Sequence, residues 1–217
     1  MLIHTGDVDL YYEKTGSGRP LLLVHGNGGT HKTFDEAVTV LSESFTCSSI
    51  DCRGRGGSTR VKEYHYRDMA DDLVCFINRL GLSDVVFCGF SDGGILGLMA
   101  AADCHDISDL IVCGANVSPK GLKQKTLWKY RIAGFTSPGS LIGMVSREPD
   151  ITKEELGRIR ARTLVLTGEH DIVKLSHSEY IASSIKGAKL MVLPGEGHGS
   201  YVRHKRRIAY LIKDFVL

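Results

Sequence analysis

Residues 89–93, Gly-Phe-Ser-Asp-Gly, have the types and spacing of a nucleophilic serine on a tight turn. An apolar run at 85–88 precedes them, and a run of small and apolar residues with helical spacing, 95–102, follows. This order predicts a strand, a sharp turn and a helix. The turn strains the serine so that its hydroxyl projects from the sheet, and the crowded positions on either side favour glycine. A glycine-rich turn whose serine only caps the helix has the same pattern. The two interpretations are distinguished by whether the rest of the chain supplies a base and an acid for Ser91.

A nucleophilic serine needs a base, and the base needs an acid that orients it. Among the nine histidines, His198 follows an expected strand at 189–193 and lies between glycines that let its ring swing toward Ser91. The acid should lie between the serine and the histidine in chain order. Asp171, four residues beyond an expected strand at 163–167, fits this order, with Glu169 in the same loop as the alternative. Asn116 also follows a strand but cannot ionise.

The oxyanion that forms when a serine attacks a carbonyl needs two aligned donors. One is the backbone N–H of Asp92, at the start of the expected helix. The other is expected to be the N–H of Asn27, in the loop that follows the apolar run at 20–24, because the glycines at 28 and 29 allow the backbone to approach closely. His25 begins this loop, and we interpret it as a residue that ties loops together through hydrogen bonds.

The elements that must position these loops are strands and helices in alternation. Continuous apolar runs predict buried strands at 20–24, 45–50, 85–89, 110–113, 163–167 and 189–193, with an edge strand at 10–13 and helices between them. This pattern predicts an α/β fold with a doubly wound, mostly parallel sheet, in which ligands bind beyond the carboxyl ends of the strands. We expect one domain, 1–217. The alternation lapses at about 117–160, where short helical patterns and a capping box at 152–155 appear.

Composition excludes several classes of protein. The chain has 217 residues, a formal net charge of +2 and 42% hydrophobic residues, which is typical of a soluble globular domain. The basic run 203–207 is interpreted as the solvated face of the last helix rather than a phosphate-binding patch. The six cysteines show no CxxC pair or zinc spacing, which favours free thiols in a reducing cytoplasm. No signal peptide and no apolar run of membrane-spanning length are found.

The motifs together resemble the α/β-hydrolase superfamily over nearly the whole chain. In family order they are residues 25–29 (HGNGG), 51–58 (DCRGRGGS), 89–94 (GFSDGG), 168–171 (GEHD) and 197–198 (GH). The resemblance implies a catalytic triad of Ser91, Asp171 and His198, an oxyanion hole from Asn27 and Asp92, and neither a cofactor nor a metal. The 117–160 insertion is shorter than the usual cap of the family and is expected to form a small helical lid over a partly open site.

Asp92 departs from the neutral residue that many relatives carry after the nucleophile. The elbow is similar to that of the valacyclovir hydrolase group, which favours amino-acid esters. A carboxylate beside Ser91 can pair with the cationic amine of such a substrate. The alternative is that Asp92 only stabilises the N-terminus of its helix through the helix dipole.

The sequence therefore predicts a cytoplasmic serine hydrolase that cleaves small carboxylic esters through an acyl-enzyme. A thioesterase, a C–C bond hydrolase or a perhydrolase would use the same triad, and a non-catalytic binding protein of this fold is the alternative from another class. The expected partner is a small-molecule ester, with no nucleic acid and no membrane, and the oligomeric state is not readable. The expected substrate-binding residues are Phe90, Asp92, Trp128, Tyr130, Phe135 and Met144.

Overall fold

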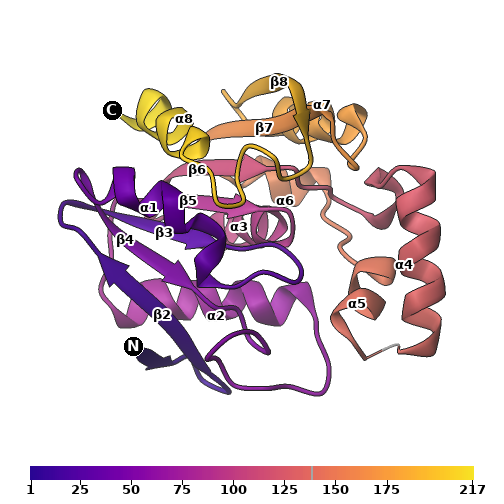
Figure 1. The fold of residues 1–217 in the computed structure, drawn as a ribbon, viewed down its shortest axis with the longest axis horizontal. Coiled ribbons are helices and arrows are strands. Elements are labelled where there is room, and N and C mark those ends of the chain that lie inside the picture. The colour runs from indigo at the N-terminus through magenta and orange to yellow at the C-terminus, as the bar shows by residue number, and fades with distance from the viewer. Residues whose placement is uncertain (138) are drawn as a thin grey trace.

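The computed structural model describes residues 1–137 and 139–217 and has an α/β architecture (Figure 1). The described residues form an eight-stranded sheet in the order β1-β2-β4-β3-β5-β6-β7-β8. The strands are β1 (Leu2–His4), β2 (Asp9–Thr15), β3 (Arg19–Val24), β4 (Phe45–Ile50), β5 (Val85–Phe90), β6 (Ile107–Cys113), β7 (Arg162–His170) and β8 (Lys189–Gly197). The helices are η1 (His31–Phe34), α1 (Asp35–Leu41), α2 (Tyr66–Arg79), α3 (Asp92–Asp103), η2 (Pro119–Gly121), α4 (Gln124–Thr136), α5 (Leu141–Arg147), α6 (Lys153–Gly157), α7 (Leu175–Ser184) and α8 (Arg207–Val216).

The sheet is mostly parallel, as the sequence predicts. β4, β3, β5, β6, β7 and β8 pair in parallel, whereas β1 with β2 and β2 with β4 pair antiparallel. The strand expected at the edge of the sheet is β2, but it is not the edge, because the three-residue strand β1 pairs with its outer side. A strand this short shows too little alternation to be recognised in a sequence.

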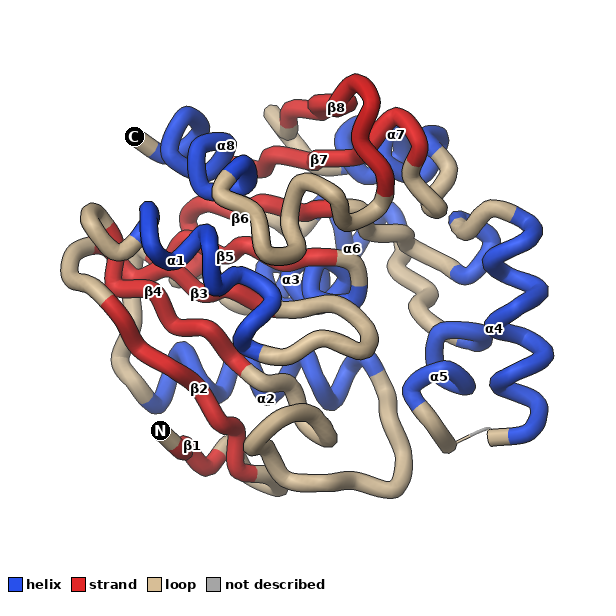
Figure 2. The backbone as a smooth tube through the Cα atoms, in the orientation of Figure 1, coloured by secondary structure: helices blue, strands red, loops and turns tan. Residues whose placement is uncertain are grey.

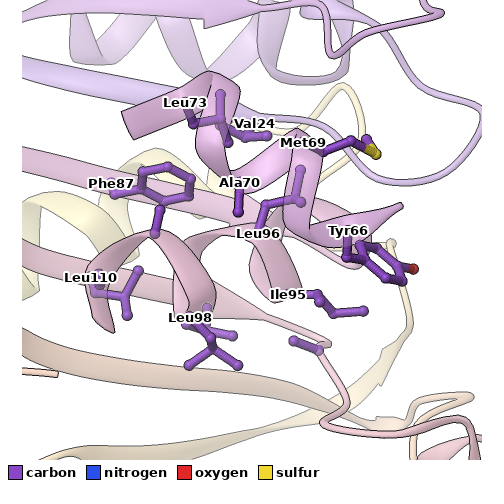
Figure 3. Close-up of a cluster of buried hydrophobic side chains, with 14 of the residues drawn as sticks. Val24, Tyr66, Met69, Ala70, Leu73, Phe87, Ile95, Leu96, Leu98 and Leu110 are labelled. Carbon is purple, nitrogen blue, oxygen red and sulfur yellow. The ribbon is translucent and has the colours of Figure 1, made fainter. Parts of the chain in front are cut away.

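Helices cover both faces of the sheet and enclose two apolar cores, which explains the continuous apolar strands (Figure 2). On one face, α1 and α8 bury residues such as Leu41 and Ile208 against the sheet. On the other, α2 and α3 pack over β3, β5 and β6. Figure 3 shows side chains of α2, among them Met69 and Leu73, beside Leu96 of α3 and Phe87 of β5. Packing against α2, β5 and β6 fixes the helix α3, whose first residue follows Ser91.

The segment between β6 and β7 leaves the sheet. Its helices α4 and α5 pack against each other and lie beyond the end of the sheet at which β5 and β6 finish (Figure 1). Gly134 of α4 lies so close to α5 that an added Cβ would be 2.9 Å from Ser146 and 3.0 Å from Gly143. The predicted capping box at the start of α6 is confirmed, with Thr152 and Glu155 each bonding the other's backbone N–H.

The six cysteines are all free, and five of them are buried, in agreement with the sequence prediction.

Candidate active site

The turn between β5 and α3 holds Ser91 in a strained conformation, with φ 55° and ψ −114°. A Cβ added at Gly89 would lie 2.0 Å from the carbonyl oxygen of Gly93, and one added at Gly93 would lie 2.1 Å from that of Val24. Since real Cβ contacts are never this short, both positions accept only glycine. The predicted crowding two residues on either side of Ser91 is therefore observed.

Ser91, His198 and Asp171 come together through two hydrogen bonds. The Oγ of Ser91 lies 3.0 Å from Nε2 of His198, and Nδ1 of the same ring lies 2.7 Å from Oδ1 of Asp171. The serine follows β5, the aspartate follows β7 and the histidine follows β8. Because these strands run in parallel, their carboxyl ends meet at one edge of the sheet. The arrangement has the hydrogen-bond order in which a histidine can remove a proton from a serine while a carboxylate orients the ring.

Asp171 is held as a carboxylate although its side chain is only 1% exposed. Burial raises its pKa, but the hydrogen bond to His198, together with backbone N–H groups that include Val173, outweighs burial, so the pKa is lowered overall. The glycine at 114, with φ +60°, lies under this pair: an added Cβ would be 3.0 Å from Nδ1 of His198. Sequence reasoning missed Gly114, because its role depends on a contact between three separate loops.

Glu169, Asn116 and His25, the other candidates for the acid and the base, make hydrogen bonds outside the triad. Glu169 accepts a hydrogen bond from the N–H of Gly195 at 2.8 Å and is exposed. Asn116 donates to the carbonyl of Ser118. His25 accepts from the N–H of Cys52 at Nε2 and lies 2.8 Å from the carbonyl of Gly26 at Nδ1. Burial lowers its pKa and keeps it neutral, so its interpretation as a residue that ties loops together is confirmed.

The loop after β3 lies directly against the serine. An added Cβ on Gly26 would be 2.8 Å from Cβ of Ser91. The N–H of Asn27, in the same loop, makes no hydrogen bond within the described part of the chain. The N–H of Asp92 is that of the first residue of α3, which precedes the hydrogen-bond ladder of the helix. Within the described residues, two N–H groups beside Ser91 are thus free for an acceptor, at the places where the sequence predicts the oxyanion donors.

Asp92 is buried, and only one of its carboxylate oxygens is bonded within the described residues. Tyr66 of α2 donates to Oδ1 at 2.8 Å, while Oδ2 and the neighbouring amide nitrogen Nδ2 of Asn27 have no partner. Burial raises the pKa of Asp92 to about 6, against the opposing influence of Tyr66, His198, Arg55 and Asn27. Tyr66 was not among the residues expected from the sequence, because nothing in α2 signals that its first residue reaches the elbow.

The apolar residues expected around the substrate divide into two groups. Phe90 is fully buried and its ring lies 5.0 Å from that of His198, while Met144 is fully buried in the core. Tyr130 is half-buried against the apolar core, and its pKa is raised by burial and by the charge of Asp92. Trp128 and Phe135, in contrast, are 53% and 89% exposed, so an enclosed pocket that includes them is not observed.

The reason lies in α4, which is apolar on two sides. Leu127 and Gly134 face the protein, and Trp128 and Phe135 lie on another part of the helix surface. A sequence pattern shows that such a helix is apolar but does not say which side is turned inward. The expectation for these two aromatic residues is corrected accordingly.

Comparison with known proteins agrees with this geometry. A family model described as alpha/beta hydrolase fold matches residues 19–136. The AB hydrolase superfamily protein YisY of Bacillus subtilis is 28% identical over 256 aligned positions, which cover 96% of this chain and 95% of the relative. The human serine hydrolase BPHL is also 28% identical, over 96% of this chain and 83% of its own.

Solved structures give the same result. A hydrolase from Pseudomonas aeruginosa PA01 is 25% identical, with a TM-score of 0.83 and coverage of 100% of this chain and 97% of the other. The enol-lactonase of Burkholderia xenovorans LB400 shares the fold, with a TM-score of 0.82 at 18% identity over 100% and 99% of the two chains. The family model covers more than half of the chain, and the relatives extend over nearly all of it; the chain belongs to the alpha/beta hydrolase fold family and is similar to hydrolases within it.

Proposed function

We propose that the protein is a serine hydrolase that cleaves small carboxylic esters through an acyl-enzyme on Ser91. The observation that carries this proposal is the chain of hydrogen bonds from Ser91 through His198 to Asp171 at a strained strand-to-helix turn. A serine that only capped a helix would need neither the histidine nor the strain. The relatives support a hydrolase in the broader sense, and the ester bond is our choice among the reactions that this site chemistry allows.

In this mechanism Oγ of Ser91 attacks the ester carbonyl carbon while Nε2 of His198 takes its proton. The N–H groups of Asn27 and Asp92 hold the oxygen of the tetrahedral intermediate, which carries the negative charge. The intermediate collapses, the C–O bond to the alcohol breaks, and the proton passes from His198 to the leaving oxygen. Water then attacks the acyl group with His198 as base, and the acid leaves. Asp171 keeps Nδ1 protonated and stabilises the charged ring.

The first test is turnover of short-chain p-nitrophenyl esters by the Ser91→Ala variant. We expect a loss on the order of 10⁴-fold or more in kcat with unchanged circular dichroism. Ser183→Ala, which removes a hydroxyl from the exposed surface of α7, is the matched control and should be as active as the wild type. Full activity of Ser91→Ala would refute the proposal.

The same site chemistry serves thioester and C–C bond cleavage and perhydrolysis. Solved structures with this fold include a meta-cleavage product hydrolase, and the curated relatives include a haloperoxidase from Rhodococcus erythropolis. A panel that offers one acyl group as an oxygen ester, a thioester and a vinylogous 1,5-diketone separates the three cleavage reactions by kcat/KM, and addition of hydrogen peroxide to the ester reaction detects perhydrolysis. Our proposal expects the oxygen ester to give the highest value.

We further propose that Asp92 favours esters that carry an amine. Its buried Oδ2 has no partner within the described residues, and an ammonium group would supply the hydrogen bond and the opposite charge. With a pKa of about 6 the carboxyl is mainly ionised at pH 7.5.

The test compares alanine methyl ester with propionic acid methyl ester, which differ only in the amine. Asp92→Asn should lower the ratio of their kcat/KM values by roughly tenfold or more at pH 7.5, since a charge-assisted hydrogen bond contributes about 1.5–3 kcal/mol. An equal effect on both esters would mean that Asp92 serves only the structure of the turn.

A further inference from the structure

The outer surface of α4 carries apolar side chains that nothing in the described structure covers. Ile132 is 67% exposed, and Trp128 and Phe135 are 53% and 89% exposed. An α-helix turns about 100° per residue, so these three side chains lie within about 60° of one another along the helix. We call this set, Trp128, Ile132 and Phe135, the apolar stripe. Isolated exposed apolar residues are normal in proteins, but three large ones aligned on a single helix face mark a contact surface.

The charged residues of α4 itself are all basic. From residue 110 to residue 147 the sequence contains six basic residues and no aspartate or glutamate, in a chain whose overall charge is only +2. The same helical geometry places Lys125 and Lys129 on one side of the stripe and Arg131 on the other. Among the described residues none of the six lies within 4.0 Å of a carboxylate. The six are Lys120, Lys123, Lys125, Lys129, Arg131 and Arg147.

We propose that α4 binds the surface of bilayers that contain anionic lipid. A helix that presents tryptophan and phenylalanine between lysine and arginine side chains has the composition of an interfacial helix, in which the apolar side chains enter the headgroup boundary and the cations meet lipid phosphates. In this proposal the helix lies on the bilayer surface and does not cross the bilayer. In the described parts of the chain no helix has the length and apolar character that crossing a membrane demands. The proposal revises the expectation from the sequence that a membrane is not a partner.

A second copy of this chain fits the surface less well. A symmetric dimer through α4 would bring two unpaired positive surfaces together, which opposes association. An anionic bilayer supplies both an apolar layer for the stripe and negative charge for the cations. The inner side of α4 carries Tyr130, which is half-buried and packs against the apolar core, so binding through the outer side leaves this side of the helix facing the protein.

Trp128 is the only tryptophan of the chain, so its fluorescence reports on α4 directly. The full chain is mixed with vesicles of phosphatidylcholine alone or with one-third phosphatidylglycerol, at low and at high salt. We expect a blue shift and co-sedimentation with the anionic vesicles at low salt, and binding roughly tenfold or more weaker with neutral vesicles or at high salt.

Two variants identify the surface. Ile132→Ser/Phe135→Ser and Lys125→Glu/Lys129→Glu should each weaken binding to anionic vesicles by roughly tenfold or more. The matched controls are Tyr210→Ser, which removes an exposed side chain from α8, and Lys186→Glu, which reverses a distant exposed charge. Both should bind like the wild type. Circular dichroism and ester turnover without vesicles check that each variant is folded.

Three results would overturn the proposal. One is the absence of a blue shift and of co-sedimentation with anionic vesicles. Another is a concentration-dependent dimer in analytical ultracentrifugation that Ile132→Ser/Phe135→Ser abolishes, which would make the apolar stripe a self-association surface. The third is binding to a single-stranded oligonucleotide or to polyglutamate in place of vesicles, without dependence on Ile132 and Phe135. These results are independent of Ser91 and of any activity on esters.

Discussion

The burial of Asp92 makes the stability of the protein depend on pH in a predictable way. Its side chain is enclosed, with a hydrogen bond from Tyr66 to one oxygen and no partner for the other within the described residues. Burial therefore raises the pKa of this carboxyl from the ordinary value of 3.8 to about 6. In the unfolded chain the same group ionises near its ordinary value, so folding and ionisation oppose each other between these two pH values.

The sign and size follow from the two pKa values. Below pH 3.8 the carboxyl is neutral in both states, and its contribution to stability is fully present. As the pH rises through 6, the folded protein must ionise a buried group, and that contribution is lost. At roughly 1.4 kcal/mol for each pH unit between the two pKa values, the loss amounts to about 3 kcal/mol. Asp92→Asn has no charge to bury and does not show this loss.

The assay is urea unfolding of the wild type and Asp92→Asn at intervals between pH 4.5 and 8. The difference in the free energy of unfolding, wild type minus variant, should fall by about 2 kcal/mol as the pH rises over this range, because roughly a third of the total loss has already occurred at pH 4.5. Because the other titrating groups are common to both proteins, the difference isolates Asp92. Asp150→Asn, which removes an exposed carboxyl, controls for the change in net charge. A flat difference, or one that rises with pH, would refute the account of Asp92 as a buried acid with a raised pKa.

Three further predictions address the fold and the site. Gly89→Ala forces a Cβ to within 2.0 Å of the carbonyl oxygen of Gly93 and should lower the free energy of unfolding by about 3 kcal/mol or more in urea titration; wild-type stability would mean that the turn is looser than described. Asp171→Asn should lower kcat for esters on the order of 10⁴-fold, whereas Glu169→Gln should leave kcat unchanged, and the reverse result would assign the acid to Glu169. Thr152→Ala removes half of the capping box of α6 and should cost about 1 kcal/mol, or a decrease in Tm of about 2–4 °C by differential scanning calorimetry; an unchanged Tm would show that the cap adds nothing to stability.

The elements that the sequence predicts well are those whose pattern is local. The strand, turn and helix around Ser91 follow from two glycines and two apolar runs, and β5 and α3 are found there. The loops that carry Asp171 and His198 could be placed at one edge because parallel strands end on the same side. The short distances among the side chains of Ser91, Asp171 and His198 follow from this topology, since the three loops that carry them leave the sheet at the same edge.

The ends of strands are less predictable where backbone pairing with a neighbouring strand continues past a residue that favours a turn. Glycine at 168 and proline at 194 suggest that the strands stop there, yet β7 and β8 extend to His170 and Gly197, which pair with each other. A backbone partner in the sheet outweighs the local preference for a turn. For the same reason β1 was missed: three residues become a strand only because β2 lies beside them.

Contacts between distant elements could not be predicted at all. Tyr66 and Asp92 are 26 residues apart on different helices, and their hydrogen bond depends on how α2 packs on α3. The outward position of Trp128 and Phe135 likewise depends on which side of α4 meets α5 and the core. In both cases the side-chain types are compatible with several arrangements, and only tertiary packing selects one.

The central claim is that Ser91 is activated by His198, and labelling with a fluorophosphonate tests it most directly. The reagent is attacked by an activated serine, and mass spectrometry of the digested protein identifies the modified residue. The account predicts stoichiometric labelling at Ser91 in the wild type and almost none in His198→Ala. A folded protein that is not labelled, or labelling of Ser91 that persists without His198, would contradict it.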